Sequence, residues 1–415
     1  MILTSTTQLP GTVADRIVAT LARPGPGLIA EIDGLRLIAI SSVVLGHIWA
    51  RIAFWVPGST EHMGIAERVV DQGYFGVMLF FALSGFILSL PFAEHALKGG
   101  SKVDLKFYFV RRVVRIEPPY FINILVATSL ALIVGHSFSE VLPHLLSSSV
   151  YLHNLIFQVH YPDASKGFYL NGVTWSLEVE VQFYILAPLL CGIFYIRSTI
   201  LRRALMLGVM IAGTLSSQLL LATKPIGSLS ILGYVDYFAA GFLLADIYVL
   251  NLRNSVDKSV LADVTGILAA VTLLCCLLAS PVHWAVSPPG PGLEWSVLSP
   301  FLVLIFYGCV FRGRWLNRLM TNRWIVVAGG MCYSFYLYHS LIIGAMFSRG
   351  TLRFYNPHHP FTINFLVQCA LILPAVVIVC TLCYLVFEQP FMRKELQRRV
   401  LAALSRVQRR EAVAY

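Results

Sequence analysis

The sequence predicts an all-α polytopic membrane protein, a bundle of about ten transmembrane helices with both termini in the cytoplasm. Hydrophobic residues make up 57% of the 415 residues, charged residues only 13%, and the mean hydropathy is +0.74. A soluble domain carries roughly a quarter charged residues, so this chain lacks the polar surface that a water-exposed globule needs. Long apolar segments, and the position of the basic residues between them, point to the same fold class.

Apolar segments of about 17 or more residues are candidate membrane spans. We identify ten of them in the sequence, at 36–56, 74–92, 117–135, 174–196, 204–221, 229–250, 260–280, 296–311, 325–346 and 363–387. The segment 296–311 is short, so we expect it to extend or tilt. No internal repeat of 20–50 residues is evident, which argues against a solenoid.

The basic residues set the predicted orientation. With the N-terminus inside, 25 of the 31 Lys and Arg residues fall in the inner connections, as the positive-inside rule requires. The net charge of +10 does not indicate a nucleic-acid partner, because the basic residues form short groups between apolar segments and do not gather on one solvated face.

Three parts of the chain follow from this topology. Residues 1–30 are a cytoplasmic N-terminal leader, residues 31–392 the membrane domain, and residues 393–415 a basic cytoplasmic tail. The leader lacks the apolar region and cleavage site of a signal peptide, and we expect a short amphipathic helix from Val13 to Leu21, broken by Pro24 and Pro26.

Metal sites and disulfides are not expected. The longest outer connection, 136–173, carries four histidines, but their spacing is irregular and no acidic cluster joins them. A connection of that length is often functional, and it could fold over the bundle. All eight cysteines, including the C-x-x-C pair Cys380 and Cys383, lie in apolar segments, where they act as small buried residues.

The first span holds the leading candidate for catalysis. Asp33 and Arg36 open it, and His47 follows eleven residues after the arginine. At about 1.5 Å per helical residue, His47 lies roughly 16 Å further along the helix, near the middle of an apolar layer of about 30 Å. An ionisable group at that depth is costly, so it indicates a functional site.

An arginine group precedes the third span. Arg111, Arg112 and Arg115 are spaced so that Arg111 and Arg115 share a helix face, and Pro118 and Pro119 are expected to mark the start of the span. Paired guanidinium groups suit phosphates, which they bind bidentately. Contact with anionic lipid explains the same residues equally well.

Two glutamates lie at the outer end of the fourth span. Glu178 and Glu180 are two residues apart, so they face different sides of the helix. Glu180 is a candidate partner for His47, either as its orienter or as the acid of an acid–base pair. Trp175 is a candidate site residue that could equally be an interfacial belt residue.

Four further candidates lie in other spans. Tyr333 and His339, with Tyr336 between them, could line one helix face, although a structural role for the histidine is an equal contender. Ser84 stands beside Gly85 as a small residue that permits close helix packing, and it lacks the setting of a hydrolase nucleophile. Glu388 marks the inner end of the last span.

These stretches, in this order, resemble the bacterial membrane acyltransferase family 3. That family comprises the O-acyltransferases of polysaccharides, nodulation factors and macrolides. The resemblance covers residues 31–392 and rests on DGLR followed by His47, FFALSGF, RRVVRIEPPY, TWSLEVEVQFY, GGMCYSFYLYH and FEQP. Cys332 replaces a serine that is usual in the family, and Val181 replaces a common second glutamate.

The resemblance implies an enzyme and its site residues. His47 corresponds to the essential histidine, Arg36 to its companion, and Glu180 to the family's glutamate. Arg111, Arg112 and Arg115 correspond to the motif thought to engage acyl-CoA. The implied donor is acetyl-CoA or another acyl-CoA, with no bound cofactor, and the implied location is the bacterial inner membrane.

We therefore expect an O-acyltransferase that moves an acyl group, with acetyl as the expected group, to a hydroxyl of a carbohydrate or glycolipid acceptor. A cell-surface polysaccharide or its lipid-linked precursor is the leading acceptor; a macrolide or a lipid stays open. His47 acts as general base or as acyl relay. No soluble esterase-like domain follows the last span in this sequence, so transfer is expected to finish within the bundle. The alternatives are a proton-coupled transporter using His47 and Glu180 and a pH-sensing membrane protein.

Overall fold

The fold is known from a computed structural model. It describes residues 11–24, 28–56, 63–157, 170–219, 230–254, 257–279, 298–348, 350–393, 395–396, 399–400 and 402. Within these ranges the regular structure is helical, and the pairing of Ser259 with Gly313 is an isolated bridge outside any strand. The predicted all-α class is confirmed.

The α-helices are α1 (Val13–Leu21), α2 (Ala30–Trp55), α3 (Ile65–Asp71), α4 (Gly76–Lys98), α5 (Leu105–Ile133), α6 (Phe138–Ser149), α7 (His153–Phe157), α8 (Trp175–Leu190), α9 (Thr199–Leu219), α11 (Val235–Ile247), α12 (Val260–Ala279), α13 (Ser299–Arg312), α14 (Trp315–Met320), α15 (Arg323–Gly330), α16 (Cys332–Ser348) and α17 (Phe361–Cys383). Short 3₁₀ segments are Gln72–Phe75, Gly172–Thr174, Cys191–Tyr195, Ile231–Gly233, Thr351–Phe354 and Gln389–Met392. Two π-helical turns are Tyr248–Leu252 and Tyr384–Glu388.

Eight helical stretches in the described part of the chain are long and apolar enough to cross a membrane. They become nine if α15 and α16, which meet at a bend of 64°, form one broken span. Helix α13, with 14 residues, is shorter than the others, as expected for the segment 296–311. Each of the ten predicted segments therefore contains a helix, whereas the orientation of the termini stays a prediction.

The outside of the bundle is apolar, as a lipid-facing surface must be. Leu189 is 78% exposed and Leu268 is 59% exposed, although both lie in predicted spans. Such side chains would be unfavourable in water and are accommodated by hydrocarbon.

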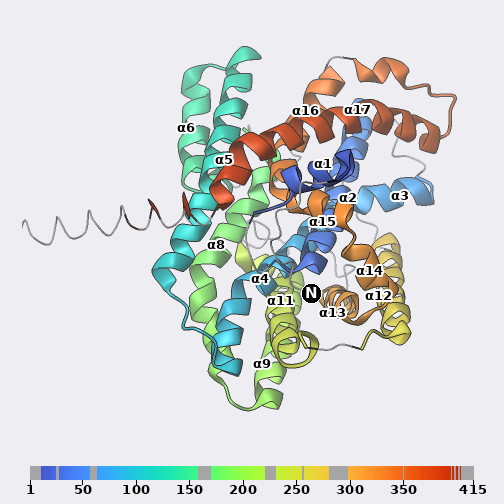
Figure 1. Cartoon of the computed structure of the whole chain (residues 1–415). Coiled ribbons are helices and arrows are strands. Elements are labelled where there is room, and N and C mark those ends of the chain that lie inside the picture. The colour runs from blue at the N-terminus through green and yellow to red at the C-terminus, as the bar shows by residue number, and fades with distance from the viewer. Residues whose placement is uncertain are drawn as a thin grey trace, which may run out of the picture.

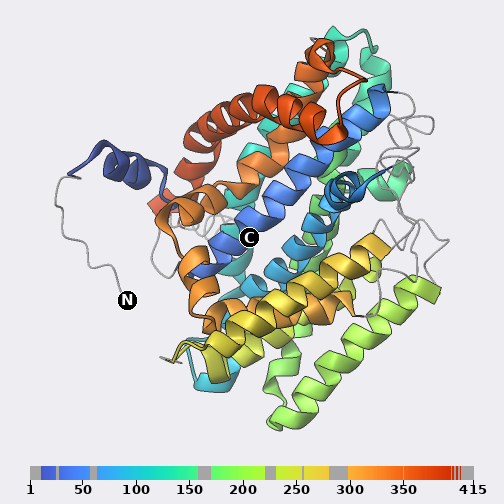
Figure 2. The ribbon, with the colours of Figure 1, turned by 90° about the vertical axis from the view of Figure 1, so that its right-hand side faces the viewer.

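Helix α2 occupies the centre of the bundle, between α4 on one side and α15 and α16 on the other (Figures 1 and 2). Glycines bring the backbones close. A Cβ atom on Gly34 would lie 2.4 Å from the carbonyl oxygen of Met320. Between α4 and α11, a Cβ on Gly85 would lie 2.3 Å from the carbonyl oxygen of Phe238. The close packing predicted for this stretch of α4 is confirmed.

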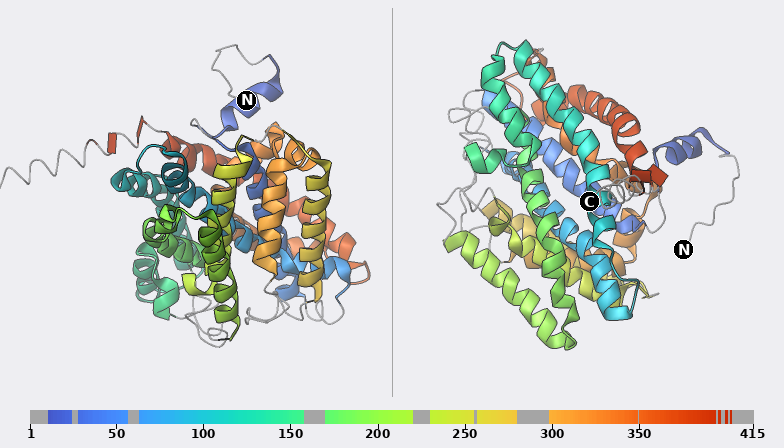
Figure 3. Two further views of the ribbon diagram at one scale, coloured as in Figure 1. Left: turned by 90° about the horizontal axis from the view of Figure 1, so that it is seen from below. Right: turned by 90° about the vertical axis from the view of Figure 1, so that its left-hand side faces the viewer.

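The remaining helices surround this centre. Helix α11 packs on α4 and on α9, α12 packs along α13, and α5 pairs with α6 (Figures 1 and 3). Helices α6 and α7 belong to the long connection 136–173, part of which therefore folds onto the bundle. The stretch 158–169 of that connection, the first ten residues of the leader and most of the basic tail lie outside the described residues.

Helix α5 differs from the prediction. The span was expected to start at Pro118 and Pro119, but the helix begins at Leu105, where Asp104 accepts a hydrogen bond from the backbone N–H of Phe107, and it runs through both prolines. Hydroxyl groups of α16 bond to carbonyls beside them. Tyr333 donates to the Ile116 carbonyl at 3.0 Å, and Tyr338 donates to the Pro119 carbonyl at 3.2 Å. These bonds attach α5 to α16, and a membrane helix can continue through internal prolines.

Candidate functional site

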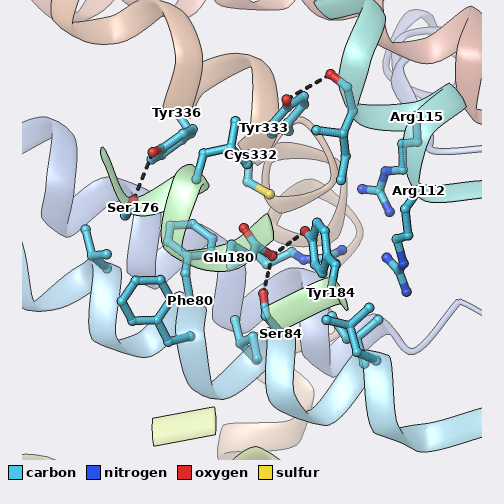
Figure 4. Close-up of a pocket in the computed structure, with 18 residues that line it drawn as sticks. Phe80, Ser84, Arg112, Arg115, Ser176, Glu180, Tyr184, Cys332, Tyr333 and Tyr336 are labelled. Carbon is cyan, nitrogen blue, oxygen red and sulfur yellow. Dashed lines mark hydrogen bonds between the residues drawn. The ribbon is translucent and has the colours of Figure 1, made fainter. Parts of the chain in front are cut away.

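A cavity of about 100 Å³ lies between α2, α4, α5, α8 and α16 (Figure 4). Its wall combines apolar side chains with a dense group of polar ones. The polar members are Arg36, Ser84, Arg112, Arg115, Ser176, Glu180, Tyr184, Cys332, Tyr333 and Tyr336. Six predicted site residues, from five different helices, therefore meet around one space: Arg36, Ser84, Arg112, Arg115, Glu180 and Tyr333.

Glu180 is the acidic group of this cavity. Its Oε1 atom accepts a hydrogen bond from Ser84 Oγ at 2.5 Å and another from Tyr184 OH at 2.5 Å (Figure 4). Oxygen–oxygen distances this short are typical of hydroxyl groups donating to an ionised carboxylate. Tyr184 is one helical turn after Glu180, so the pair is local, whereas Ser84 arrives from α4. The arrangement fits a fixed negative charge at the cavity wall.

Glu178 faces away from this cavity, as predicted from its spacing. It is 1% exposed, and its Oε2 atom accepts a hydrogen bond from the backbone N–H of Asn154 at 2.9 Å. Asn154 also donates through its side chain to the Trp175 carbonyl at 2.9 Å. Glu178 therefore attaches α7 to α8 and has a structural role.

The arginines of α5 carry unbalanced positive charge. Among the described residues, Arg112 and Arg115 form no ion pair with a carboxylate, and Arg112 lies beside the rings of Tyr108 and Tyr184, at 5.9 Å and 5.7 Å. The Nε atom of Arg112 is buried without a hydrogen bond. Arg36, in contrast, donates to Asp33 Oδ1 at 2.6 Å. Buried charges of this kind are stabilised when an anion binds.

A larger cavity of about 470 Å³ adjoins the first, and Arg36, Arg112 and Arg115 border both. Its lining is rich in arginine and includes Arg23, Arg36, Arg111, Arg112, Arg115 and Arg253. All three arginines predicted to bind the donor line this second cavity. By the predicted orientation it lies at the cytoplasmic end of the bundle. We call it the arginine vestibule.

His47 lies further along α2. It is eleven residues from Arg36, which is three helical turns plus about 20°, so both side chains leave the same face of the helix about 16 Å apart. The Nδ1 atom lies 2.8 Å from the Val43 carbonyl oxygen. Because a carbonyl only accepts, Nδ1 carries the proton and Nε2 is the basic nitrogen.

One aromatic neighbour of His47 is His339 of α16. The two imidazole rings meet edge to face with centroids 4.8 Å apart. His339 Nδ1 lies 2.7 Å from the Phe335 carbonyl, and its Nε2 atom is buried without a hydrogen bond. The predicted pairing of Glu180 with His47 is wrong for this structure, since Glu180 bonds to Ser84 and Tyr184 near Arg36.

Two further candidates, Tyr336 and Trp175, are held by contacts with neighbouring segments. Tyr336 donates to the Val173 carbonyl and lies 2.9 Å from Ser176 Oγ. Trp175 is buried and stacks on Tyr74 with ring centroids 5.4 Å apart, so it is no lipid-facing belt residue.

Glu388 is fully buried at the end of the last span. It accepts hydrogen bonds from the backbone N–H of Ser334 at 3.0 Å and from Ser334 Oγ at 2.6 Å. It therefore joins the π-helical turn after α17 to the first turn of α16.

Two members of the site were missed at the level of sequence. Tyr184 could have been found, because it follows Glu180 by four residues on a predicted helix. Arg23 could not, because its place in the vestibule depends on how the leader docks.

Comparison with known proteins identifies the family to which the chain belongs. The sequence profile described as an acyltransferase domain, of acyltransferase family 3, matches residues 29–385. A Staphylococcus aureus (strain COL) protein with an O-acetyltransferase name is 24% identical over 343 residues, covering 78% of this chain and 51% of that protein. O-acetyltransferase OatA of Staphylococcus aureus (strain NCTC 8325 / PS 47) is 22% identical over 333 residues, covering 77% and 51%.

Nodulation protein 10 of Rhizobium leguminosarum bv. viciae is 31% identical over 173 residues, covering 39% of this chain and 44% of that protein. The chain thus spans about half the length of the curated relatives it matches. No solved structure matches it. Because the family profile covers nearly the whole membrane domain that carries the site, the chain belongs to acyltransferase family 3 and is a multi-pass membrane protein of that family.

Proposed function

We propose that this protein transfers an acetyl group from acetyl-CoA to a hydroxyl group of a sugar-containing acceptor at the membrane. The observation that carries the proposal is the pair of adjoining cavities bordered by Arg36, Arg112 and Arg115. The larger has a surplus of guanidinium groups that suits the phosphates of CoA. Arg36, which lines the smaller cavity, leaves α2 on the same face as His47, about 16 Å away, and His47 itself lines neither cavity.

The chemistry follows from the protonation of His47. The acceptor hydroxyl oxygen attacks the thioester carbonyl carbon while its proton passes to His47 Nε2. The C–S bond then breaks, and the CoA thiolate leaves and takes that proton. In the relay version, Nε2 attacks the thioester first, the C–S bond breaks and CoA leaves as its thiolate. The acceptor oxygen then displaces the acetyl group from Nε2, and the proton of the acceptor hydroxyl goes to the thiolate. Arg36, about 16 Å from His47 along α2, holds the phosphorylated end of the donor.

Glu180 contributes fixed charge in this scheme. Its carboxylate, held by Ser84 and Tyr184, faces the guanidinium groups and keeps the cavity from becoming uniformly cationic. The O-acetyltransferase names of the relatives support an acetyl group and a hydroxyl acceptor. A cell-surface polysaccharide or its lipid-linked precursor is the acceptor class that the sequence resemblance implies.

The test uses purified protein, labelled acetyl-CoA and a panel of candidate glycans. His47→Ala is expected to abolish label transfer while the protein still elutes as a folded species in detergent. His358→Ala, which removes an exposed histidine, is the matched control and should retain full activity. Normal transfer by His47→Ala would refute the proposal.

A second measurement separates the two mechanisms. Wild-type protein is incubated with acetyl-CoA in the absence of acceptor, quenched and digested. An acetyl group on the peptide that contains His47 supports the relay; its absence, together with single-turnover transfer once acceptor is added, supports direct attack.

A further inference from the structure

The N-terminal helix α1 is attached to the membrane domain although it precedes the residues that match the family. Thr12 and Asp15 form a capping box at its start, and Asp15 also accepts a hydrogen bond from Arg323 at 2.6 Å. At its end, Gln389 Nε2 donates to the Thr20 carbonyl at 2.7 Å. Helix α1 is thus held at both ends, by α15 and by the segment after α17.

Apolar contacts support the same position. Val18 and Leu21 pack against a small cluster formed by Val327, Met331, Tyr384 and Met392. Helix α1 lies against α15, at the edge of the bundle in Figure 2. The chain leaving α1 is directed by this docking toward the arginine vestibule.

This part of the chain places Arg23 in the wall of the arginine vestibule. Its side chain is 13% exposed and lines the vestibule. Its Nη1 atom lies 3.3 Å from Asp33 Oδ1 and makes no hydrogen bond, whereas Arg36 donates to the same oxygen at 2.6 Å. Arg23 is therefore a buried cation that shares its carboxylate with a better-placed competitor.

Positively charged side chains outnumber negatively charged ones around the vestibule. Six guanidinium groups line it, together with Glu94, which pairs with Arg253 at 2.5 Å; Asp33 lies beside Arg23 and Arg36. Glu388 also interacts with Arg115 and Arg23, and the guanidinium groups still outnumber these carboxylates. Burial, followed by the nearby Arg36, lowers the pKa of Arg23 to about 9. A phosphorylated ligand would relieve that repulsion.

We propose that Arg23, positioned by α1, binds a phosphate of the CoA donor and so extends the donor site beyond the family domain. This inference rests on the proposed function. The ligand class is a phosphorylated nucleotide thioester; the phosphate of an anionic lipid headgroup has the same chemistry and is the competing source.

The experiment measures CoA affinity for the full-length protein in phosphatidylcholine nanodiscs. Arg23→Gln is expected to weaken CoA binding by about tenfold or more, as for the loss of one charge-assisted contact. Arg16→Gln, an exposed position on the same helix, makes the same charge change and should bind CoA like wild type. Arg23→Lys should be intermediate, because lysine keeps the charge but not the bidentate geometry.

Two further arms make the test specific. Pantetheine, which lacks every phosphate, should bind Arg23→Gln and wild type equally. In nanodiscs containing phosphatidylglycerol, CoA affinity of the wild type should be unchanged if the site serves the donor.

The outcomes are distinct. If Arg23→Gln and Arg16→Gln bind CoA equally well, Arg23 is not a donor residue. If phosphatidylglycerol weakens CoA binding to the wild type but not to Arg23→Gln, the phosphate comes from lipid. If the wild type binds no CoA and transfers no acetyl group, the proposed function itself fails, and this inference with it.

Discussion

Replacing Asp33 by asparagine tests the electrostatics of the vestibule directly. Asp33 is 1% exposed, and its Oδ1 atom lies 2.6 Å from Arg36 Nη1 and 3.3 Å from Arg23 Nη1. The asparagine side chain would keep the shape but remove the charge between two buried guanidinium groups. Removing one partner of a buried ion pair costs about 3–5 kcal/mol. We therefore expect Asp33→Asn to lower the free energy of unfolding by that amount.

The chain offers a matched control. Asp246 is fully buried and lies 2.5 Å from Arg202 Nε and 2.6 Å from Arg203 Nε, and none of these three residues lines the vestibule. Asp246→Asn should lose a similar free energy of unfolding. The two variants are then distinguished by their response to CoA.

CoA should offset the loss of stability in Asp33→Asn but not in Asp246→Asn. A ligand at about 100 times its Kd stabilises the folded state by about 2.7 kcal/mol, and more as Kd falls. Asp33→Asn removes a carboxylate that repels phosphates, so CoA should bind it more tightly and stabilise it more than wild type. The assay is unfolding in mixed micelles, followed by tryptophan fluorescence, with and without CoA. Equal CoA shifts for Asp33→Asn and Asp246→Asn would refute the reasoning.

Three further outcomes are expected. Gly85→Val should destabilise the protein by about 1–3 kcal/mol, measured by the same unfolding assay, because its Cβ would lie 2.3 Å from a carbonyl oxygen of α11, whereas Gly208→Val meets nothing within 4 Å and should be tolerated. The CoA affinity of wild type should fall as the pH rises through about 9, where unliganded Arg23 loses its proton; a titration of Arg23→Gln should lack this step. Tyr184→Phe removes one of two hydrogen bonds to Glu180 and should lower thermal stability by about 1.5–3 kcal/mol, and an unchanged melting curve would argue against an ionised carboxylate.

Features that depend on one segment were predictable from the sequence. The ten apolar segments each contain a helix. In lipid the backbone N–H and C=O groups find no water, so an apolar segment must form hydrogen bonds within itself. The predicted helix from Val13 to Leu21 is confirmed with the same bounds, and the capping box of Thr12 and Asp15 explains why it starts there.

Features that depend on contact between distant segments could not be predicted from the sequence. Glu180 was expected beside His47, but the depth at which α4 crosses α8 brings Ser84 to it instead. The start of α5 was misplaced because the two prolines were expected to mark it, whereas Asp104 caps the helix at Leu105 and the helix continues through them. His47 and His339 were each predicted as candidates. They are almost 300 residues apart in the sequence, so the contact between their rings could not be predicted from their spacing.

The bend between α15 and α16 affects the field inside the bundle. A continuous span would have its positive N-terminal pole at the membrane surface, but the break at Met331 puts the first turn of α16, with Cys332 and Tyr333, in the wall of the smaller cavity. Glu388 accepts the N–H of Ser334 in that turn and offsets the pole with a carboxylate. The backbone therefore adds little positive potential to the wall of the smaller cavity, and the positive charge there comes from the guanidinium groups of Arg36, Arg112 and Arg115.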